Sequence, residues 1–222
     1  MSPLLLADFG TTYSKILELD QGPGEPEIMP SQELAPDLKV DVATGHNGRR
    51  HCQRYVNELT ALAKGGEALI AESDYVLLDC GSRDIKFVRY ENGKIADMGW
   101  NAECGASMGF TIELLAHYYD IDYASLAVPA KTFNVICGVL GMSHIFDAIT
   151  TGASEHEAVA RFVKGIAINA YRFAGSPVKI YLSGGLGENP LFVASLPAET
   201  VVLGRFVLLA GLEEIARQEQ RH

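Results

Sequence analysis

The stretch DFGTTYSK occupies residues 8–15, and the chain repeats its pattern as DCGSRDIK at residues 79–86. Both copies read Asp-x-Gly-Ser/Thr-x-x-x-Lys, and in both an apolar run precedes the Asp and another follows the Lys. Apolar runs on either side of a short, glycine-containing polar segment are typical of two strands joined by a tight turn. Each copy therefore predicts a β-hairpin with a polar turn.

The residue types in these turns suit the binding of phosphate. A glycine lets the backbone approach a ligand closely, and the N–H groups of a tight turn form a concave site for an anion. Hydroxyl groups add hydrogen-bond donors, and a lysine adds a positive charge. An Asp at the end of an apolar strand can hold Mg²⁺ through water, because Mg²⁺ keeps much of its hydration shell. The candidate cofactor-binding residues of the two turns are Asp8, Gly10, Thr11, Thr12, Lys15, Asp79, Gly81, Ser82 and Lys86.

Two such hairpins facing each other would clamp the phosphates of ATP or ADP together with Mg²⁺. The alternative is a pair of ordinary β-hairpins with polar turns. One copy alone favours that alternative, whereas two copies with matched flanks favour the nucleotide clamp. Asp84 lies on the second turn and is the candidate catalytic residue, because a carboxylate there can position the attacking water.

The composition is that of a globular protein. The 222 residues are 48% hydrophobic and 21% charged, which is enough to bury a sizeable core. A net charge of −10 argues against general binding to nucleic acid, which requires a basic face. No apolar run approaches the length of a membrane span, and the apolar run at 4–7 is too short for a signal peptide. We therefore expect a cytoplasmic protein with no nucleic-acid or membrane partner.

The order of predicted elements is strand-rich hairpin, helix, strand-rich hairpin, helices, strand and helix. It includes an edge strand near 27–29 and a helix at about 51–63 that ends at Gly65-Gly66. Ser154 and Glu157 form a capping box that begins a long helix. This order predicts an α/β chain of two related lobes. The first lobe is expected at 1–73, with the C-terminal helix at 204–222 as a candidate to pack on it, and the second at 74–203.

Further motifs give the chain a family resemblance. ATGHNGR at 43–49, WNAECGASMG at 100–109 and LSGGLGEN at 182–189 accompany the two hairpins. Together they resemble the two-lobed actin-like ATPase (ribonuclease H-like) fold of actin, Hsp70 chaperones and sugar kinases, here with a shortened first lobe. Within that fold the motifs resemble the activator ATPases of 2-hydroxyacyl-CoA dehydratases and the ATPase subunits of benzoyl-CoA reductase. The resemblance implies that Gly184, Gly185 and Glu188 shape the adenosine side of an ATP site.

The same resemblance implies an iron–sulfur cluster and a partner enzyme. Members of this family are homodimers, or pairs of related subunits, that share one 4Fe–4S cluster with two cysteines from each chain. ATP turnover in them drives a low-potential electron into a partner iron–sulfur reductase or dehydratase. By resemblance the metal ligands here are Cys104 and Cys137. Both are expected at the start of a helix, where the positive end of the helix dipole stabilises a thiolate.

Several alternatives stay open at the level of sequence. Cys104 and Cys137 can also be buried structural thiols, which is the commoner fate of a free cysteine. Arg83 replaces a glutamine of the family motif, and Ser107-Met108-Gly109 replaces Gly-Thr-Gly. These departures leave the rate of hydrolysis and the electron acceptor undetermined. The competing functions are a small-molecule kinase of the same fold and a nucleotide-binding scaffold that hydrolyses weakly and carries no cluster.

Overall fold

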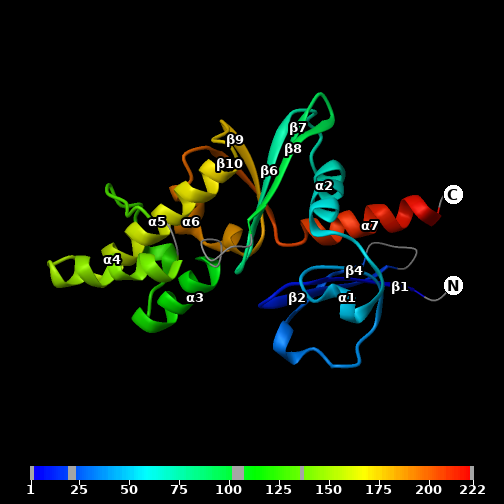
Figure 1. The fold of residues 1–222 in the computed structure, drawn as a ribbon, viewed down its shortest axis with the longest axis horizontal. Coiled ribbons are helices and arrows are strands. Elements are labelled where there is room, and N and C mark those ends of the chain that lie inside the picture. The colour runs from blue at the N-terminus through cyan, green and yellow to red at the C-terminus, as the bar shows by residue number, and fades with distance from the viewer. Residues whose placement is uncertain (1–2, 20–23, 102–107, 136–137, 221–222) are drawn as a thin grey trace. The chain divides into compact units, whose positions relative to one another are not determined.

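The computed structural model describes residues 3–19, 24–101, 108–135 and 138–220 (Figure 1). Its internal contacts divide the chain into two units. The first unit comprises Met1–Ser73, Glu91–Ile95 and Arg205–His222, and the second comprises Asp74–Tyr90 and Ala96–Gly204. No helix within the described residues is both long enough and apolar enough to cross a membrane.

A five-stranded sheet forms the centre of the first unit, with the strand order β3-β2-β1-β4-β5. β1 pairs with β2 in the antiparallel sense and with β4 in the parallel sense. The edge strand expected near 27–29 is confirmed as β3. The strands are β1 (Leu4–Phe9), β2 (Tyr13–Leu19), β3 (Glu27–Pro30), β4 (Val40–Thr44) and β5 (Cys52–Tyr55).

The second sheet repeats the topology of the first. Its strand order is β10-β9-β6-β7-β8, so that β6, β7, β8, β9 and β10 take the places of β1 to β5. β6 is antiparallel to β7 and parallel to β9, as β1 is to β2 and β4. The repeated sequence pattern is therefore a repeated fold, and the predicted α/β class is confirmed. The strands are β6 (Tyr75–Cys80), β7 (Ile85–Glu91), β8 (Lys94–Asn101), β9 (Lys179–Ser183) and β10 (Glu199–Gly204).

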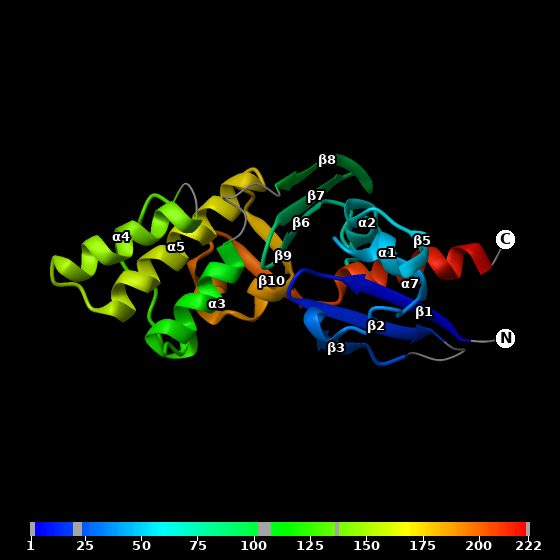
Figure 2. The same ribbon diagram turned by 60° about the horizontal axis from the view of Figure 1, so that its bottom comes forward.

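Helices pack on the second sheet through its largest core. α5 (Glu155–Phe173) places Phe162 and Ile166 against Leu78 of β6 and Leu182 of β9 in one buried cluster. The predicted cap is present, because the Ser154 side chain accepts a hydrogen bond from Glu157 N. α4 lies alongside α5 in both views (Figures 1 and 2). The other helices of this unit are α3 (Met108–Tyr119), α4 (Gly138–Thr150), α6 (Pro190–Ser195) and the 3-10 turns Tyr123–Ser125 and Gly185–Glu188.

The helix predicted at 51–63 is present over 58–63, but its predicted start and end are wrong. Residues 52–55 form strand β5 beside β4, and the helix α2 runs over Glu58–Leu69, straight through Gly65-Gly66. Gly65 packs closely against α7 (Val207–Gln220), which lies beside α2 (Figures 1 and 2). A Cβ on Gly65 would lie 2.0 Å from the carbonyl oxygen of Val207, and one on Gly211 would lie 1.9 Å from that of Ala61. Close helix contact, rather than helix termination, therefore explains Gly65.

Candidate functional site

The first turn joins β1 to β2 and contains a buried ion pair. Asp8 is 4% exposed and lies directly opposite Lys15 across the hairpin. The Nζ of Lys15 is 2.7 Å from Oδ2 of Asp8. Gly10 permits the tight turn, since a Cβ there would lie 2.5 Å from the carbonyl oxygen of Tyr13. Ser31, which follows β3, donates its hydroxyl to the carbonyl oxygen of Gly10 at 2.8 Å.

The second turn joins β6 to β7 and holds two carboxylates beside one lysine. Lys86 is 2% exposed, with Nζ 2.7 Å from Oδ1 of Asp84 and 3.9 Å from Oδ2 of Asp79. The other oxygen of Asp84, Oδ2, accepts a hydrogen bond from Nε1 of Trp100 at 2.7 Å. The turn closes through Gly81 N, which donates to the carbonyl oxygen of Asp84 at 3.0 Å. The predicted catalytic and cofactor-binding residues of this turn therefore lie together.

The start of α3 rests on the second turn. Phe110 N donates to the carbonyl oxygen of Ser82 at 3.0 Å. A Cβ on Gly109 would lie 2.6 Å from the carbonyl oxygen of Gly81, so a glycine is required for this close approach. Ser82 consequently serves the turn through its backbone as well as through its candidate hydroxyl.

Each sheet adds a hydroxyl and a glycine that the sequence did not single out together. Thr44 at the end of β4 lies beside Asp8, and Ser183 at the end of β9 lies beside Asp79. Ser183 donates its hydroxyl to Oδ1 of Asp79 at 2.8 Å. Thr44 is fully buried, and its hydroxyl has no hydrogen-bond partner among the residues that the structure describes. The signal that could have revealed this pair is a Thr-Gly or Ser-Gly step at the end of each apolar strand.

The glycines after these hydroxyl residues have matching geometry. Gly45 and Gly184 both have a φ of 89°. A Cβ would lie 2.4 Å from the carbonyl oxygen of Phe9 in one case and of Cys80 in the other. The left-handed backbone and the missing side chain leave the peptide groups of each turn close to the paired strand end, which is the kind of backbone cradle that binds an anion.

Next to Gly185 the second unit has a hollow of about 560 Å³. Its wall includes Ile112, Ile121 and Tyr123, and Glu188 lies at the same hollow. Tyr123 donates its hydroxyl to the carbonyl oxygen of Ile112 at 2.7 Å, and burial raises the pKa of its phenol well above the ordinary value. An apolar wall with a few polar groups suits an adenine ring and a ribose.

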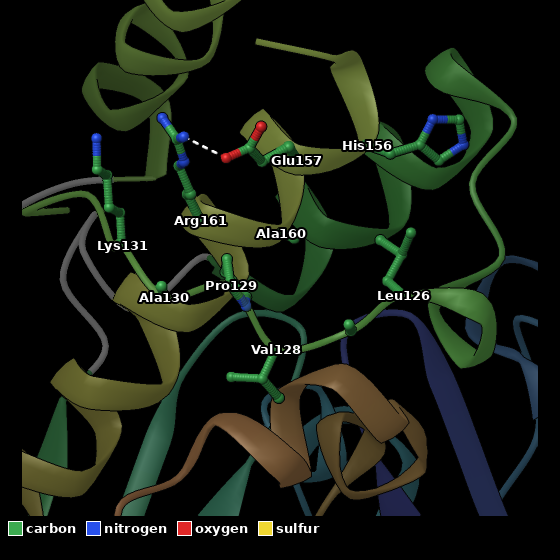
Figure 3. Close-up of a pocket in the computed structure, with 10 residues that line it drawn as sticks. Leu126, Val128, Pro129, Ala130, Lys131, His156, Glu157, Ala160 and Arg161 are labelled. Carbon is green, nitrogen blue, oxygen red and sulfur yellow. Dashed lines mark hydrogen bonds and ion pairs between the residues drawn. The ribbon is translucent and has the colours of Figure 1, made fainter.

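Another hollow of about 440 Å³ lies between residues 126–131 and α5 (Figure 3). Arg161 forms an ion pair with Glu157 there, as the dashed line in Figure 3 marks. Lys164 donates to the carbonyl oxygen of Pro129 at 2.7 Å. None of the predicted site residues lines this hollow, and its Arg161 is already paired with a carboxylate, so it is a poorer phosphate site than the glycine turns.

The cysteines divide into those that the structure describes and those that it does not. Burial is the main cause that raises the pKa of the Cys80 thiol well above its ordinary value, and the neighbouring charge of Asp79 adds to it. Burial also raises the pKa of Cys52. Cys104 and Cys137, the candidate metal ligands, lie outside the described residues. Within the described part of the chain no three His, Cys, Asp or Glu side chains gather as a metal site.

Comparison with known proteins gives relatives of one kind. No family model matches the chain. It is 23% identical over 166 residues to the (R)-2-hydroxyglutaryl-CoA dehydratase activating ATPase of Acidaminococcus fermentans, covering 69% of this chain and 63% of that protein. It is 23% identical over 179 residues to the 2-hydroxyisocaproyl-CoA dehydratase activator of Clostridioides difficile, covering 73% of this chain and 65% of that protein. The matches thus span less than two thirds of these relatives.

Solved structures share the fold. The activator of the 2-hydroxyisocaproyl-CoA dehydratase from Clostridium difficile with bound ADPNP has a TM-score of 0.75 at 20% identity, covering 98% of this chain and 97% of that chain. Component A of the Acidaminococcus fermentans (R)-2-hydroxyglutaryl-CoA dehydratase has a TM-score of 0.79 at 17% identity, covering 100% of both chains. A putative 2-dehydro-3-deoxygalactonokinase from Sinorhizobium meliloti has a TM-score of 0.59 at 13% identity, covering 97% of this chain and 99% of that chain.

These findings confirm two predictions made from the motifs. The chain has the actin-like ATPase fold, and it resembles the activating ATPases of 2-hydroxyacyl-CoA dehydratases. One of these relatives is named as an activating ATPase of a dehydratase, and the other as a dehydratase activator. The roles of the individual site residues stay predictions.

Proposed function

We propose that this chain binds and hydrolyses Mg-ATP and uses the turnover to pass a low-potential electron from a 4Fe–4S cluster to a partner reductase or dehydratase. One observation carries the proposal. Two turns with the same Asp, Gly, hydroxyl and Lys pattern occupy the same topological place in two sheets. They do so in a fold shared with an activator that was solved with bound ADPNP.

Each turn offers two kinds of group that would bind a magnesium nucleotide. The turns' backbone N–H groups and hydroxyls, including those of Thr11, Thr12 and Ser82, would bind phosphate oxygens. Asp8 and Asp79 would hold Mg²⁺ through water. The buried hydroxyl of Thr44 beside Asp8 has no hydrogen-bond partner among the described residues, so it would be free to bind there. Mg²⁺, when bound, neutralises charge that develops on the phosphates.

Hydrolysis would depend on the second turn. Asp84 would position the attacking water, because its carboxylate lies on the second turn, where Lys86 and Trp100 hold it. Lys86 offsets the charge of both carboxylates, since its buried ammonium lies beside them. The adenosine would occupy the hollow next to Gly184-Gly185, with Glu188 at its edge.

Cys104 and Cys137 would hold the cluster, which when bound supplies the low-potential electron. Two thiolates per chain cannot complete the four-cysteine set of a cubane, so a homodimer or a pair with a related subunit would complete it. The curated relatives are named as activators of dehydratases, which supports a partner enzyme of that kind. We place the protein in the cytoplasm, with no membrane or nucleic-acid partner.

The nucleotide part is tested by changing Asp8 to Ala. We expect the affinity for Mg-ADP, measured by calorimetry, to fall by about 10–100-fold, the usual effect of losing a group that orients a metal's water ligands. Asp97 is the matched control, because it is an exposed carboxylate on β8 whose side chain accepts a hydrogen bond from the neighbouring Met98 N and has no other hydrogen bond among the described residues. Equal Mg-ADP affinity and ATPase rate in wild type, Asp8→Ala and Asp97→Ala would refute the assignment.

The cluster part is tested by iron uptake. Anaerobically reconstituted protein should be brown and hold one cluster per dimer. Cys104→Ser and Cys137→Ser should each lose the iron and the cluster-linked dimer while keeping nucleotide affinity. Cys52→Ser, which removes a half-buried thiol of the first unit, is the control that should keep both. Absence of iron in wild type would leave a nucleotide-binding scaffold as the function.

A further inference from the structure

We propose that Trp100 is a positioning residue for the ATPase reaction, which holds the Asp84 carboxylate in the orientation needed to place the attacking water. The inference rests on the proposed function, because Asp84 matters in this way only if the chain hydrolyses ATP. Trp100 opens the motif WNAECGASMG at 100–109, but the sequence analysis assigned it no role.

The geometry leaves Asp84 little freedom. Nε1 of Trp100 donates to Oδ2 at 2.7 Å, while Nζ of Lys86 lies 2.7 Å from Oδ1. The same Nζ lies 5.3 Å from the centre of the indole ring, within the range of a cation–π contact. Both carboxylate oxygens are therefore held from different sides, and the two groups that hold them also contact each other. A carboxylate supported in this way has one preferred orientation, as a catalytic group requires.

The two repeats differ at the position of Asp84, the carboxylate that Trp100 holds. In the first turn the place of Asp84 is taken by Tyr13, and Lys15 lies 2.7 Å from Asp8. In the second turn Lys86 lies 2.7 Å from Asp84 but 3.9 Å from Asp79. The lysine thus lies closest to the strand-end carboxylate in the first repeat and closest to the turn carboxylate in the second. Only the second repeat has the carboxylate that a water-positioning role needs.

The third strand of each repeat ends at its turn. After β3, Ser31 donates its hydroxyl to the carbonyl oxygen of Gly10 and its N–H to that of Thr12, both at 2.8 Å. At the end of β8, the corresponding strand, Trp100 reaches the second turn instead. The first contact holds backbone, whereas the second holds the candidate catalytic side chain. The end of the third strand therefore contacts the turn in both repeats, but through different groups.

Trp100 is the single tryptophan of the chain, so its N–H can be observed alone. In an ¹⁵N–¹H correlation spectrum of the whole protein, we expect the one indole cross-peak to shift, and its exchange with solvent to accelerate by at least tenfold, when Asp84 is changed to Ala. Asp97→Ala, on the same strand, should leave the peak in place. The remaining cross-peaks report whether Asp84→Ala folds, and Asp84→Asn serves as a second variant that keeps the side-chain volume. An unmoved indole peak in both Asp84 variants would overturn the contact.

The positioning role is tested with Trp100→Phe, which keeps an aromatic ring and removes the N–H. We expect kcat for ATP hydrolysis to fall by about tenfold, the size of one hydrogen bond to a charged group, with the Kd for Mg-ADP within about threefold of wild type. Unchanged kcat, or a loss confined to Kd, would overturn the role. If the wild-type chain binds no nucleotide, the proposed function fails and this role with it. If nucleotide is bound and hydrolysed equally well by Trp100→Phe, only the role of Trp100 fails.

Discussion

Replacing Lys86 with Met should destabilise the second unit strongly. The side chain of Lys86 is 3% exposed and lies beside two carboxylates whose side chains are 8% and 17% exposed. Methionine keeps most of the volume but removes the charge. Removing one partner of a buried ion pair costs about 3–5 kcal/mol, because it leaves the other charge uncompensated. Trp100 still donates to Asp84, so we expect the lower end, about 3 kcal/mol in the free energy of unfolding.

Trp100 also provides the assay, because the only tryptophan lies against Lys86 in the second unit. Urea unfolding followed by its emission reports this unit rather than an average over the chain. A loss of about 3 kcal/mol corresponds to a fall in Tm of about 6–12 °C for a chain of this size. Adding Asp84→Asn should restore part of the loss, since it removes one of the two carboxylates that lie beside Lys86.

Lys64→Met is the control for removing a lysine from a surface pair. Lys64 lies 2.6 Å from Glu67, but the two side chains are 32% and 39% exposed. Exposed pairs contribute about 0–1 kcal/mol, so circular dichroism should find little change in unfolding. If Lys86→Met unfolds within about 0.5 kcal/mol of wild type, a range typical of surface substitutions, the reasoning from burial is wrong.

Three further predictions concern packing, the buried hydroxyl and pH. Gly211→Ala would place a Cβ 1.9 Å from a backbone oxygen of α2, so it should lower the free energy of unfolding of the first unit by about 1–3 kcal/mol. Gly187→Ala, with 3.4 Å to its nearest neighbour, should change the free energy of unfolding of its own unit, the second, little. Thr44→Val removes a buried hydroxyl that has no hydrogen-bond partner among the described residues. The free energy of unfolding of the nucleotide-free protein should therefore rise by about 1 kcal/mol, while the affinity for Mg-ADP falls. A lower free energy of unfolding in urea would contradict this. Because burial raises the pKa of Tyr123 in the folded chain, stability should be constant below the ordinary value of 10.0 and fall above it, where only the unfolded chain loses the proton. Tyr123→Phe should make this alkaline slope shallower by up to about 1.4 kcal/mol per pH unit, and equal slopes from pH 9 to 11.5 would contradict it.

Much of the fold was predictable because its signals are local. Apolar residues on both sides of a glycine turn predicted both hairpins, and Ser154 with Glu157 three residues later predicted the helix cap. The bounds of the helix expected at 51–63 were wrong for the opposite reason, because they depend on contacts between distant segments. Residues 52–55 became a strand because β4 pairs with them, and α2 continued through its glycines because α7 packs there.

Some features of the candidate site were likewise predictable from the sequence, and others came only from the structure. The sequence by itself determined which residues carry carboxylates, lysines and glycines, because a repeated eight-residue pattern places them on two turns. The structure alone decided that Thr44 and Ser183 lie beside Asp8 and Asp79, because parallel pairing joins strands with other elements between them in the chain. It alone decided that Lys86 pairs with Asp84 more closely than with Asp79, and that Trp100 holds the other oxygen. Whether a hydrogen bond or ion pair forms depends on differences of a few tenths of an ångström in the distance between two side chains. The spacing of residues along one strand does not contain that information.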